Sequence, residues 1–146
     1  MIRNLELKDR AEFIDMATEF YGSNAVLHSI PVEYIERTFS EIMSNSPYAK
    51  CHIIEHDSET AGYGLISITY SNEVGSLVVF IEELFIKERF RGHGLGGKYL
   101  DFIHDMYSGT VRRFRLEISK NNTDAERLYL RKGYKEFDYK QMVRGL

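Results

Sequence analysis

Four glycines lie within six residues, and this cluster constrains the fold more than any other feature of the chain. Gly92, Gly94, Gly96 and Gly97 follow an almost wholly apolar stretch, residues 77–86, and overlap the start of a helical apolar spacing over 95–107. Glycine lets a backbone approach a bound group without a Cβ clash, and the first amides of a helix lack intrahelical partners. The cluster therefore predicts an anion-binding turn between a buried strand and a helix.

The charge around the glycines is opposite in sign to that of the rest of the chain. Residues 87–98 carry four basic side chains and one acidic side chain, a local charge of +3 in a chain of net charge −3, so the remainder carries −6. A positive loop on an acidic body favours a compact anion over a general nucleic-acid surface, which needs a basic excess. The alternative is an ordinary strand–helix turn with solvated basic residues, but four glycines exceed what one turn needs.

Composition limits the class of protein. Apolar residues make up 43% of the 146 residues, enough for the core of one domain over 1–146. Cys51 is the only cysteine, which excludes an intramolecular disulfide and a multi-cysteine zinc site, and we expect no metal. Residues 1–10 lack the apolar core of a secretory signal, and no apolar run approaches the ~20 residues of a membrane span. We therefore expect a cytoplasmic protein without nucleic-acid or membrane partners.

The apolar spacing predicts an α+β fold. The order is β-α-α-β-β-β-α-β-α-β, with one further strand as an option. Antiparallel hairpins followed by a strand–helix–strand crossover predict a mixed, mostly antiparallel sheet with helices on both faces. The predicted strands cover residues 2–6, 50–56, 63–70, 77–86 and 112–119, with one or two more in 134–143, and the helices cover 7–21, 31–46, 95–107 and 122–132.

A dinucleotide site is a competing interpretation of the glycines. Gly92, Gly94 and Gly97 satisfy G-x-G-x-x-G, and Glu117 follows twenty residues after Gly97. In that motif, however, the strand runs nearly into the glycines, whereas here five residues separate Ile86 from Gly92. Only 49 residues follow Gly97, too few for two mononucleotide-binding halves.

Two motifs resemble the GNAT superfamily of N-acetyltransferases. Arg91-x-x-Gly94-x-Gly96 is similar to the family's R/Q-x-x-G-x-G/A signature, and residues 82–86 (EELFI) are similar to its E-D-L-Y-V stretch. Residues 122–134, with Asn122, Ala125, Leu128, Tyr129, Gly133 and Tyr134, resemble its N-x-x-A-x-x-L-Y-x-x-x-G-F motif, with tyrosine for the last phenylalanine. The motifs occur in order, separated by one strand. The resemblance covers residues 60–136 closely, and residues 7–48 correspond to the two variable helices of the substrate side.

The resemblance implies acetyl-coenzyme A as the co-substrate and a set of residues that hold it. The backbone of the strand end would bind the pantetheine arm, the loop amides would hold the pyrophosphate, and an amide near Leu84 or Phe85 would bind the thioester oxygen. Asn122 would bond the pantetheine or cap its own helix, a position that asparagine favours. The predicted cofactor-binding residues are Leu84, Phe85, Ile86, Arg91, Gly92, His93, Gly94, Leu95, Gly96, Gly97 and Asn122.

The resemblance also points to an acid for the leaving thiolate. Tyr129 matches the family's tyrosine, and a phenol with a pKa near 10 keeps its proton at neutral pH and can donate it to a thiolate. The alternative is a core aromatic residue, because the chain contains ten tyrosines.

Three carboxylates are candidates for the base. Glu82 and Glu83 interrupt an apolar strand, where burial raises the pKa of a carboxyl group. Because successive strand residues point to opposite faces, we expect at most one of them to face the thioester. We favour Glu82, the first acidic residue of the matching pair. Glu117 is the third candidate, since Leu116-Glu117-Ile118 resembles the ribosomal-protein alanine acetyltransferases. Salt bridges would be the structural alternative for all three.

These observations predict an acetyl-CoA-dependent N-acetyltransferase that acts by direct transfer to a primary amine of a small molecule or peptide. The alternative is a non-catalytic module that binds or senses acyl-CoA. A homodimer is a further expectation, since relatives often pair.

Overall fold

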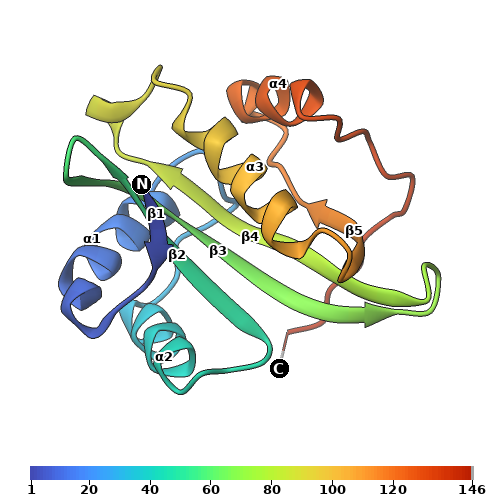
Figure 1. The fold of residues 1–146 in the computed structure, drawn as a ribbon, viewed down its shortest axis with the longest axis horizontal. Coiled ribbons are helices and arrows are strands. Elements are labelled where there is room, and N and C mark those ends of the chain that lie inside the picture. The colour runs from blue at the N-terminus through green and yellow to red at the C-terminus, as the bar shows by residue number, and fades with distance from the viewer. Residues whose placement is uncertain (146) are drawn as a thin grey trace.

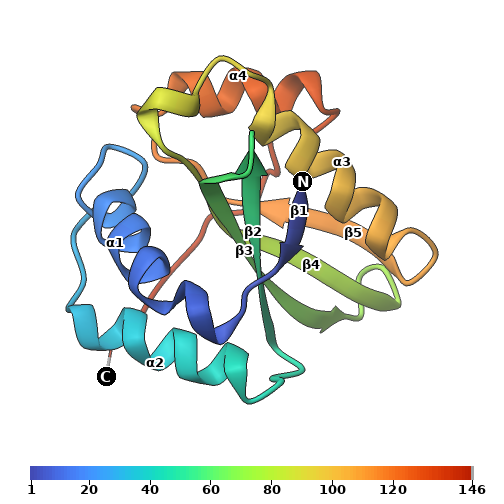
Figure 2. The same ribbon diagram turned by 60° about the vertical axis from the view of Figure 1, so that its left-hand side comes forward.

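The computed structural model describes residues 1–145, which form a five-stranded sheet with helices on both faces (Figures 1 and 2). The strands are β1 (Ile2–Asn4), β2 (Ala49–His56), β3 (Glu59–Ser71), β4 (Ser76–Ile86) and β5 (Val111–Leu116). The helices are α1 (Arg10–Tyr21), α2 (Val32–Met43), α3 (Leu95–Tyr107) and α4 (Thr123–Arg131), with short 3-10 turns at Leu7–Asp9 and Glu88–Phe90.

The strands lie in the order β1-β2-β3-β4-β5. The first three pairs are antiparallel, and β4 and β5 are parallel. The parallel pair is joined through α3, as a crossover connection requires. The predicted α+β class and the mostly antiparallel mixed sheet are therefore confirmed. No helix among residues 1–145 has both the length and the apolar composition needed to cross a membrane.

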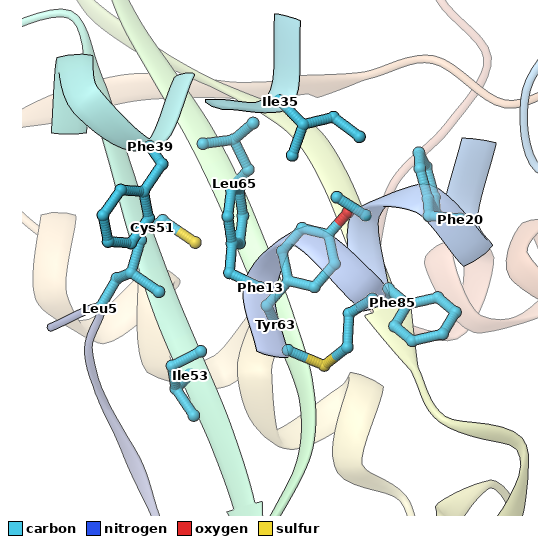
Figure 3. Packing of buried hydrophobic residues seen from close by; sticks show 12 residues of the cluster. Leu5, Phe13, Phe20, Ile35, Phe39, Cys51, Ile53, Tyr63, Leu65 and Phe85 are labelled. Atoms are coloured by element: carbon cyan, nitrogen blue, oxygen red, sulfur yellow. The ribbon is translucent and has the colours of Figure 1, made fainter. Parts of the chain in front are cut away.

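One apolar core lies between the sheet and the helices α1 and α2. Phe13 packs edge-on against Tyr63 with 5.3 Å between ring centroids, and the Phe39 ring centroid lies 6.0 Å from that of Phe13. Figure 3 shows the same cluster from close by, with side chains from both helices meeting those of β2, β3 and β4. Arg3 of β1 forms two hydrogen bonds with buried Asp9, of 2.7 and 2.9 Å, which fixes the strand to the start of α1.

The second core lies under α3 and α4 on the opposite face. Tyr99 of α3 is fully buried against β3 at Gly64, where any Cβ would come within 2.0 Å of the tyrosine ring. Gly64 therefore allows the helix to lie close to the sheet. The Tyr99 hydroxyl group lies 3.1 Å from Nδ1 of buried His52, and burial lowers the pKa of His52 to about 4.

The last predicted strand does not form. Residues 134–145 contain no strand, although they run past β5 toward the side of the sheet that carries α1 and α2 (Figure 2). Side chains hold part of this segment instead of a backbone ladder. The Phe137 ring lies against the guanidinium groups of Arg113 and Arg115, and the Tyr139 hydroxyl donates to Glu73.

Candidate functional site

The strands β4 and β5 separate partway along their length. Their residue pairs run from Leu77 with Val111 to Ile81 with Leu116, and no pairing follows among the described residues. β4 nevertheless continues to Ile86, paired only with β3. The backbone of residues 82–86 thus has no strand neighbour on the β5 side. A gap between two strands of one sheet leaves backbone hydrogen-bonding groups available for a ligand.

A bulge in β4 begins at the same place. Leu65 of β3 pairs with Glu83, but the next residue, Ile66, pairs with Ile81, so Glu82 is the extra residue. A bulge breaks the alternation of side chains between the two faces. Glu82 bonds to Ser67 and Glu83 bonds to Tyr63, so both carboxylates lie on the face of α1 and α2. The strict alternation on which we based the expectation that at most one of them faces the thioester therefore does not hold here.

Glu83 is buried between two tyrosines. The Tyr21 hydroxyl donates to its Oε1 at 2.6 Å, and the Tyr63 hydroxyl donates to its Oε2 at 2.5 Å. Burial raises the pKa of the Glu83 carboxyl group, although the two hydrogen bonds oppose this shift. Both oxygens are occupied, so the carboxylate is fixed in place. The bonds of these two tyrosines to Glu83 were not predicted from the sequence, because Tyr21 lies 62 residues and Tyr63 lies 20 residues from Glu83.

Glu82 and Glu117 are both exposed. Ser67 Oγ donates to Glu82 Oε1 at 2.5 Å, which leaves Oε2 without a bond to the described residues. Glu117 follows the end of β5, and no ion pair joins it to Arg113 or Arg115 within residues 1–145. The two carboxylates therefore stand on either side of the gap, Glu82 on β4 and Glu117 just beyond β5.

The glycine loop presents free amides at the start of α3. Gly94, the N-cap residue, has a φ of 72°, and Gly92 has a φ of 81°, a region that favours glycine. No side chain caps the helix. The first backbone amide of α3 with a helical partner is that of Lys98, which donates to the carbonyl oxygen of Gly94. The amides of Leu95, Gly96 and Gly97 therefore lack helical partners, as a phosphate site at a helix N-terminus requires.

Two of the four basic residues near the loop are already paired. Lys87 forms an ion pair with Glu12 of α1, and Arg89 pairs with Glu59 at 2.6 Å. The local charge of +3 counted along the sequence is thus partly neutralised by residues distant in the chain. Arg91 is exposed and donates from Nε to Ile86 O at 3.0 Å, which ties the loop to the end of β4.

The remaining loop residues have structural contacts of their own. Nδ1 of His93 lies 3.1 Å from the carbonyl oxygens of Phe90 and Arg91. A Cβ on Gly96 would lie 3.0 Å from Leu128, and one on Gly97 would lie 3.1 Å from Lys132. Both glycines therefore bring the start of α3 close to α4, a packing role that the sequence analysis did not separate from phosphate binding.

Tyr129 projects from α4 into the core on the α3 side. Its ring is buried against Tyr134 with 5.7 Å between centroids, and burial raises its pKa to about 12. The tyrosine is therefore both a core aromatic residue and a phenol that keeps its proton at neutral pH. Within residues 1–145 its hydroxyl group forms no hydrogen bond, yet no fully buried side-chain polar atom there is left unpaired. The hydroxyl group is thus reachable by solvent or a ligand.

Asn122 caps α4, since its Oδ1 accepts from Ala125 N at 3.4 Å. This is the structural role that the sequence analysis gave as an alternative. In the same loop, Ser119 Oγ donates to Asn24 O at 2.5 Å, which joins the β5–α4 connection to the α1–α2 connection near the gap. The sequence contains no local signal for this bond, because the two residues are 95 positions apart.

Comparison with known proteins gives the family. Residues 11–134 match the acetyltransferase (GNAT) family, and the chain therefore belongs to it. The resemblance noted in the sequence is confirmed. No curated protein matches the chain.

Solved structures share the fold. An integron cassette protein from the mobile metagenome of Cole Harbour Salt Marsh has a TM-score of 0.83 at 22% identity, covering 99% of this chain and 90% of that protein. The aminoglycoside N-acetyltransferase AAC(6')-Iy in complex with CoA has a TM-score of 0.79 at 19% identity, covering 99% and 93%. A predicted acetyltransferase from Clostridium acetobutylicum with acetyl-CoA has a TM-score of 0.79 at 17% identity, covering 99% and 95%. Two of these structures thus contain coenzyme A or acetyl-CoA, the cofactor expected from the sequence.

The buried Glu83 carboxyl group predicts a specific dependence of stability on pH. Its pKa is raised above the ordinary 4.5 in the folded state, so the folded protein retains a proton that the unfolded chain has already lost. The free energy of unfolding should therefore fall as pH rises from about 4.5 through the folded-state pKa, by at most about 1.4 kcal/mol per pH unit for this one group. Urea unfolding of the wild type and Glu83→Gln between pH 4 and 8 measures the difference.

We expect Glu83→Gln to lack this decline, so that its stability relative to the wild type improves with pH. Glu82→Gln, which changes the exposed neighbour, serves as the control and should follow the wild type. A constant difference between wild type and Glu83→Gln across the range would contradict the account.

Proposed function

We propose that this protein is an acetyl-CoA-dependent N-acetyltransferase that transfers an acetyl group directly to a primary amine of a small molecule or peptide. The observation that carries the proposal is the separation of β4 from β5 after Ile81 and Leu116, beside the free amides of Leu95, Gly96 and Gly97. The extended pantetheine arm of the cofactor fits the gap between the strands, and its pyrophosphate fits the free amides. The family to which the chain belongs supports this combination.

The chain has groups suited to each part of coenzyme A. The backbone of residues 84–86 has no strand partner on the β5 side of β4 and would bind the pantetheine arm there, with Ile86 O already accepting one hydrogen bond from Arg91 Nε. The amides at the start of α3, with the exposed side chain of Arg91, would hold the pyrophosphate. Gly94 leaves open space in front of those amides, because nothing lies within 4 Å of a Cβ built there.

When bound, acetyl-CoA supplies an activated acetyl thioester. The protein's residues then have two proton transfers to perform. A base must take a proton from the acceptor's ammonium group before its nitrogen forms a bond to the carbonyl carbon. An acid must give a proton to the sulfur as the carbon–sulfur bond breaks. Once it is bonded to the carbonyl carbon, the nitrogen carries two protons and releases one of them to solvent. Atoms and charge then balance without an oxidant or a reductant, because an ammonium group and a thioester give an amide, a thiol and one released proton.

The proposed base, Glu82, and the proposed acid, Tyr129, lie on opposite faces of the sheet beside the gap. Glu82 lies on the α1 and α2 face, and its Oε2 has no hydrogen bond within residues 1–145, so it can take the proton of an amine that arrives from that side. Glu83 lies beside it with both oxygens bound to tyrosines, and it helps to fix the local structure. Tyr129 lies on the α3 and α4 face, with its proton retained by a pKa of about 12. Glu82 would thus take a proton from the amine on one side of the carbonyl group, and Tyr129 would give a proton to the sulfur on the other side.

Binding of the cofactor is tested with Gly94→Glu. Acetyl-CoA at about 100 times its Kd should stabilise the wild type by roughly 2.7 kcal/mol, whereas Gly94→Glu should remove the shift because a carboxylate would stand before the phosphate-binding amides. Thermal unfolding with and without acetyl-CoA measures this, and NAD should give no shift to either protein.

Gly109→Glu is the matched control. Gly109 has a φ of 82° with open space around it, like Gly94, but it follows the other end of α3. Both variants should lose similar stability from backbone strain, yet Gly109→Glu should keep the acetyl-CoA shift. An undiminished shift in Gly94→Glu would refute the proposed phosphate site.

Turnover distinguishes the enzyme from a non-catalytic acyl-CoA-binding module. With an amine panel and thiol release as the measurement, Glu82→Gln and Tyr129→Phe should each lower kcat by about 10²- to 10⁴-fold, the usual contribution of a positioned acid or base. Tyr134→Phe, the ring packed against Tyr129, and Glu88→Gln, an exposed carboxylate in the 3-10 turn, are the controls and should retain activity.

An unchanged rate in Tyr129→Phe would show that the acid is another group. If Glu83→Gln lost activity and Glu82→Gln did not, the base would be Glu83. Acetyl-CoA binding without thiol release from any amine would favour the binding module.

A further inference from the structure

Arg115 lies on the acceptor side of the sheet between two aromatic rings. On β5 it pairs with Phe80 of β4, and its guanidinium carbon lies 5.8 Å from the centroid of the Phe80 ring and 5.1 Å from that of Phe137. Its neighbours Phe114 and Leu116 pack into the core under α3 and α4. Because strand side chains alternate, Arg115 faces the opposite side, the side of Glu82, Glu83 and α1.

Arg115 differs from the other arginines in its charge environment. Three arginines among residues 1–145 are partly buried, and two of them have acidic partners there. Arg3 pairs with Asp9 and Glu55, and Arg113 pairs with Glu73 at 3.1 Å. No described acidic side chain forms an ion pair with Arg115. A partly desolvated guanidinium group without an anionic partner is suited to receive one from a ligand, because its planar donors match a carboxylate in two parallel hydrogen bonds.

Arg115 and Glu82 lie on neighbouring strands, and their side chains are on the same face of the sheet. Glu82 lies two residues beyond Phe80 on β4, and Arg115 lies opposite Phe80 on β5. That places their backbones about 7 Å apart along the strand and about 4.8 Å apart across it. Two long side chains therefore present a negative and a positive group within the length of a small molecule. A ligand with an amine and a carboxylate has the complementary pair of charges.

We propose that the acceptor is a small molecule with a carboxylate near its reactive amine, of the amino acid type, and that Arg115 binds the carboxylate while the amine faces Glu82. This inference rests on the proposed acetyl transfer and specifies its substrate class. Arg113 lies on the same face two residues away, but its charge is paired with Glu73, so Arg115 rather than Arg113 is available to an anionic group of the ligand. The Phe80 and Phe137 rings hold the guanidinium plane and add apolar contact for the carbon skeleton of the ligand.

Matched acceptor sets test the proposal. Each set contains an amino acid, its carboxamide and the amine that lacks the carboxyl group, and the sets span several side chains. The measured quantity is the ratio of kcat/KM for the acid to that for the carboxamide, by thiol release. For the wild type we expect a ratio of about 10 to 100 in at least one set, the range for a hydrogen-bonded charge pair. Arg115→Gln should bring that ratio to about 1.

Arg112→Gln is the control variant, since Arg112 is an exposed arginine of the same strand that, among the described residues, stacks on no aromatic ring. It should keep the wild-type ratio. A ratio near or below 1 in every set that the wild type turns over would overturn the carboxylate proposal and leave acetyl transfer intact. An equal fall of the acid-to-carboxamide ratio in Arg112→Gln and Arg115→Gln would also overturn the proposal.

If no amine in the panel leads to thiol release, that outcome would count against acetyl transfer itself. A binding measurement then tests whether Arg115 binds a carboxylate. Calorimetry on the CoA-saturated protein then compares N-acetyl amino acids with their N-acetyl carboxamides. The proposal expects the acids to bind at least tenfold more tightly to the wild type, and this preference to be absent in Arg115→Gln. Equal binding of acids and amides, or no binding of either, would overturn it.

Discussion

The rest of the site depends on the point where β4 loses β5 as a neighbour. Parallel pairing ends at Ile81 and Leu116, and the next residue of β4, Glu82, is the extra residue of a bulge. The two features act together: the gap exposes backbone groups, and the bulge turns two consecutive carboxylates to one face. After β5 the chain turns to α4, which packs on the start of α3 through Leu128 and Gly96. The glycine loop is thereby held next to the open strand end.

The charges around this gap form an ordered arrangement. Lys87 and Arg89 form ion pairs with Glu12 and Glu59, so the groups that we propose for binding the pyrophosphate are the amides at the start of α3 and the side chain of Arg91. On the face of α1 and α2, Glu82 and Arg115 carry opposite charges on neighbouring strands. On the other face, Tyr129 is the neutral phenol. The proposed roles thus divide between the two faces of the sheet, with the gap between them.

Local patterns predicted the parts of the site that are contiguous in sequence. The helix over 95–107 and the glycine turn before it follow from apolar spacing and from the positions of Gly92 and Gly94. The bulge could not be predicted, because it depends on the register between β3 and β4. The bonds of Tyr21 and Tyr63 to Glu83 could not be predicted for the same reason, since they join distant segments. The prediction of a last strand was wrong because side-chain contacts, not a backbone ladder, hold Phe137 and Tyr139. A pattern of alternating residues does not distinguish these two arrangements.

The central claim is that coenzyme A lies along the open edge of β4 with its pyrophosphate at the start of α3. A titration of ¹⁵N-labelled protein with coenzyme A, followed by backbone amide NMR, tests it residue by residue. The account predicts the largest shifts at residues 82–86 and at the amides of Leu95, Gly96 and Gly97, with small changes in α2 and β1. Saturable shifts confined to other elements, or no shifts at millimolar coenzyme A, would contradict it.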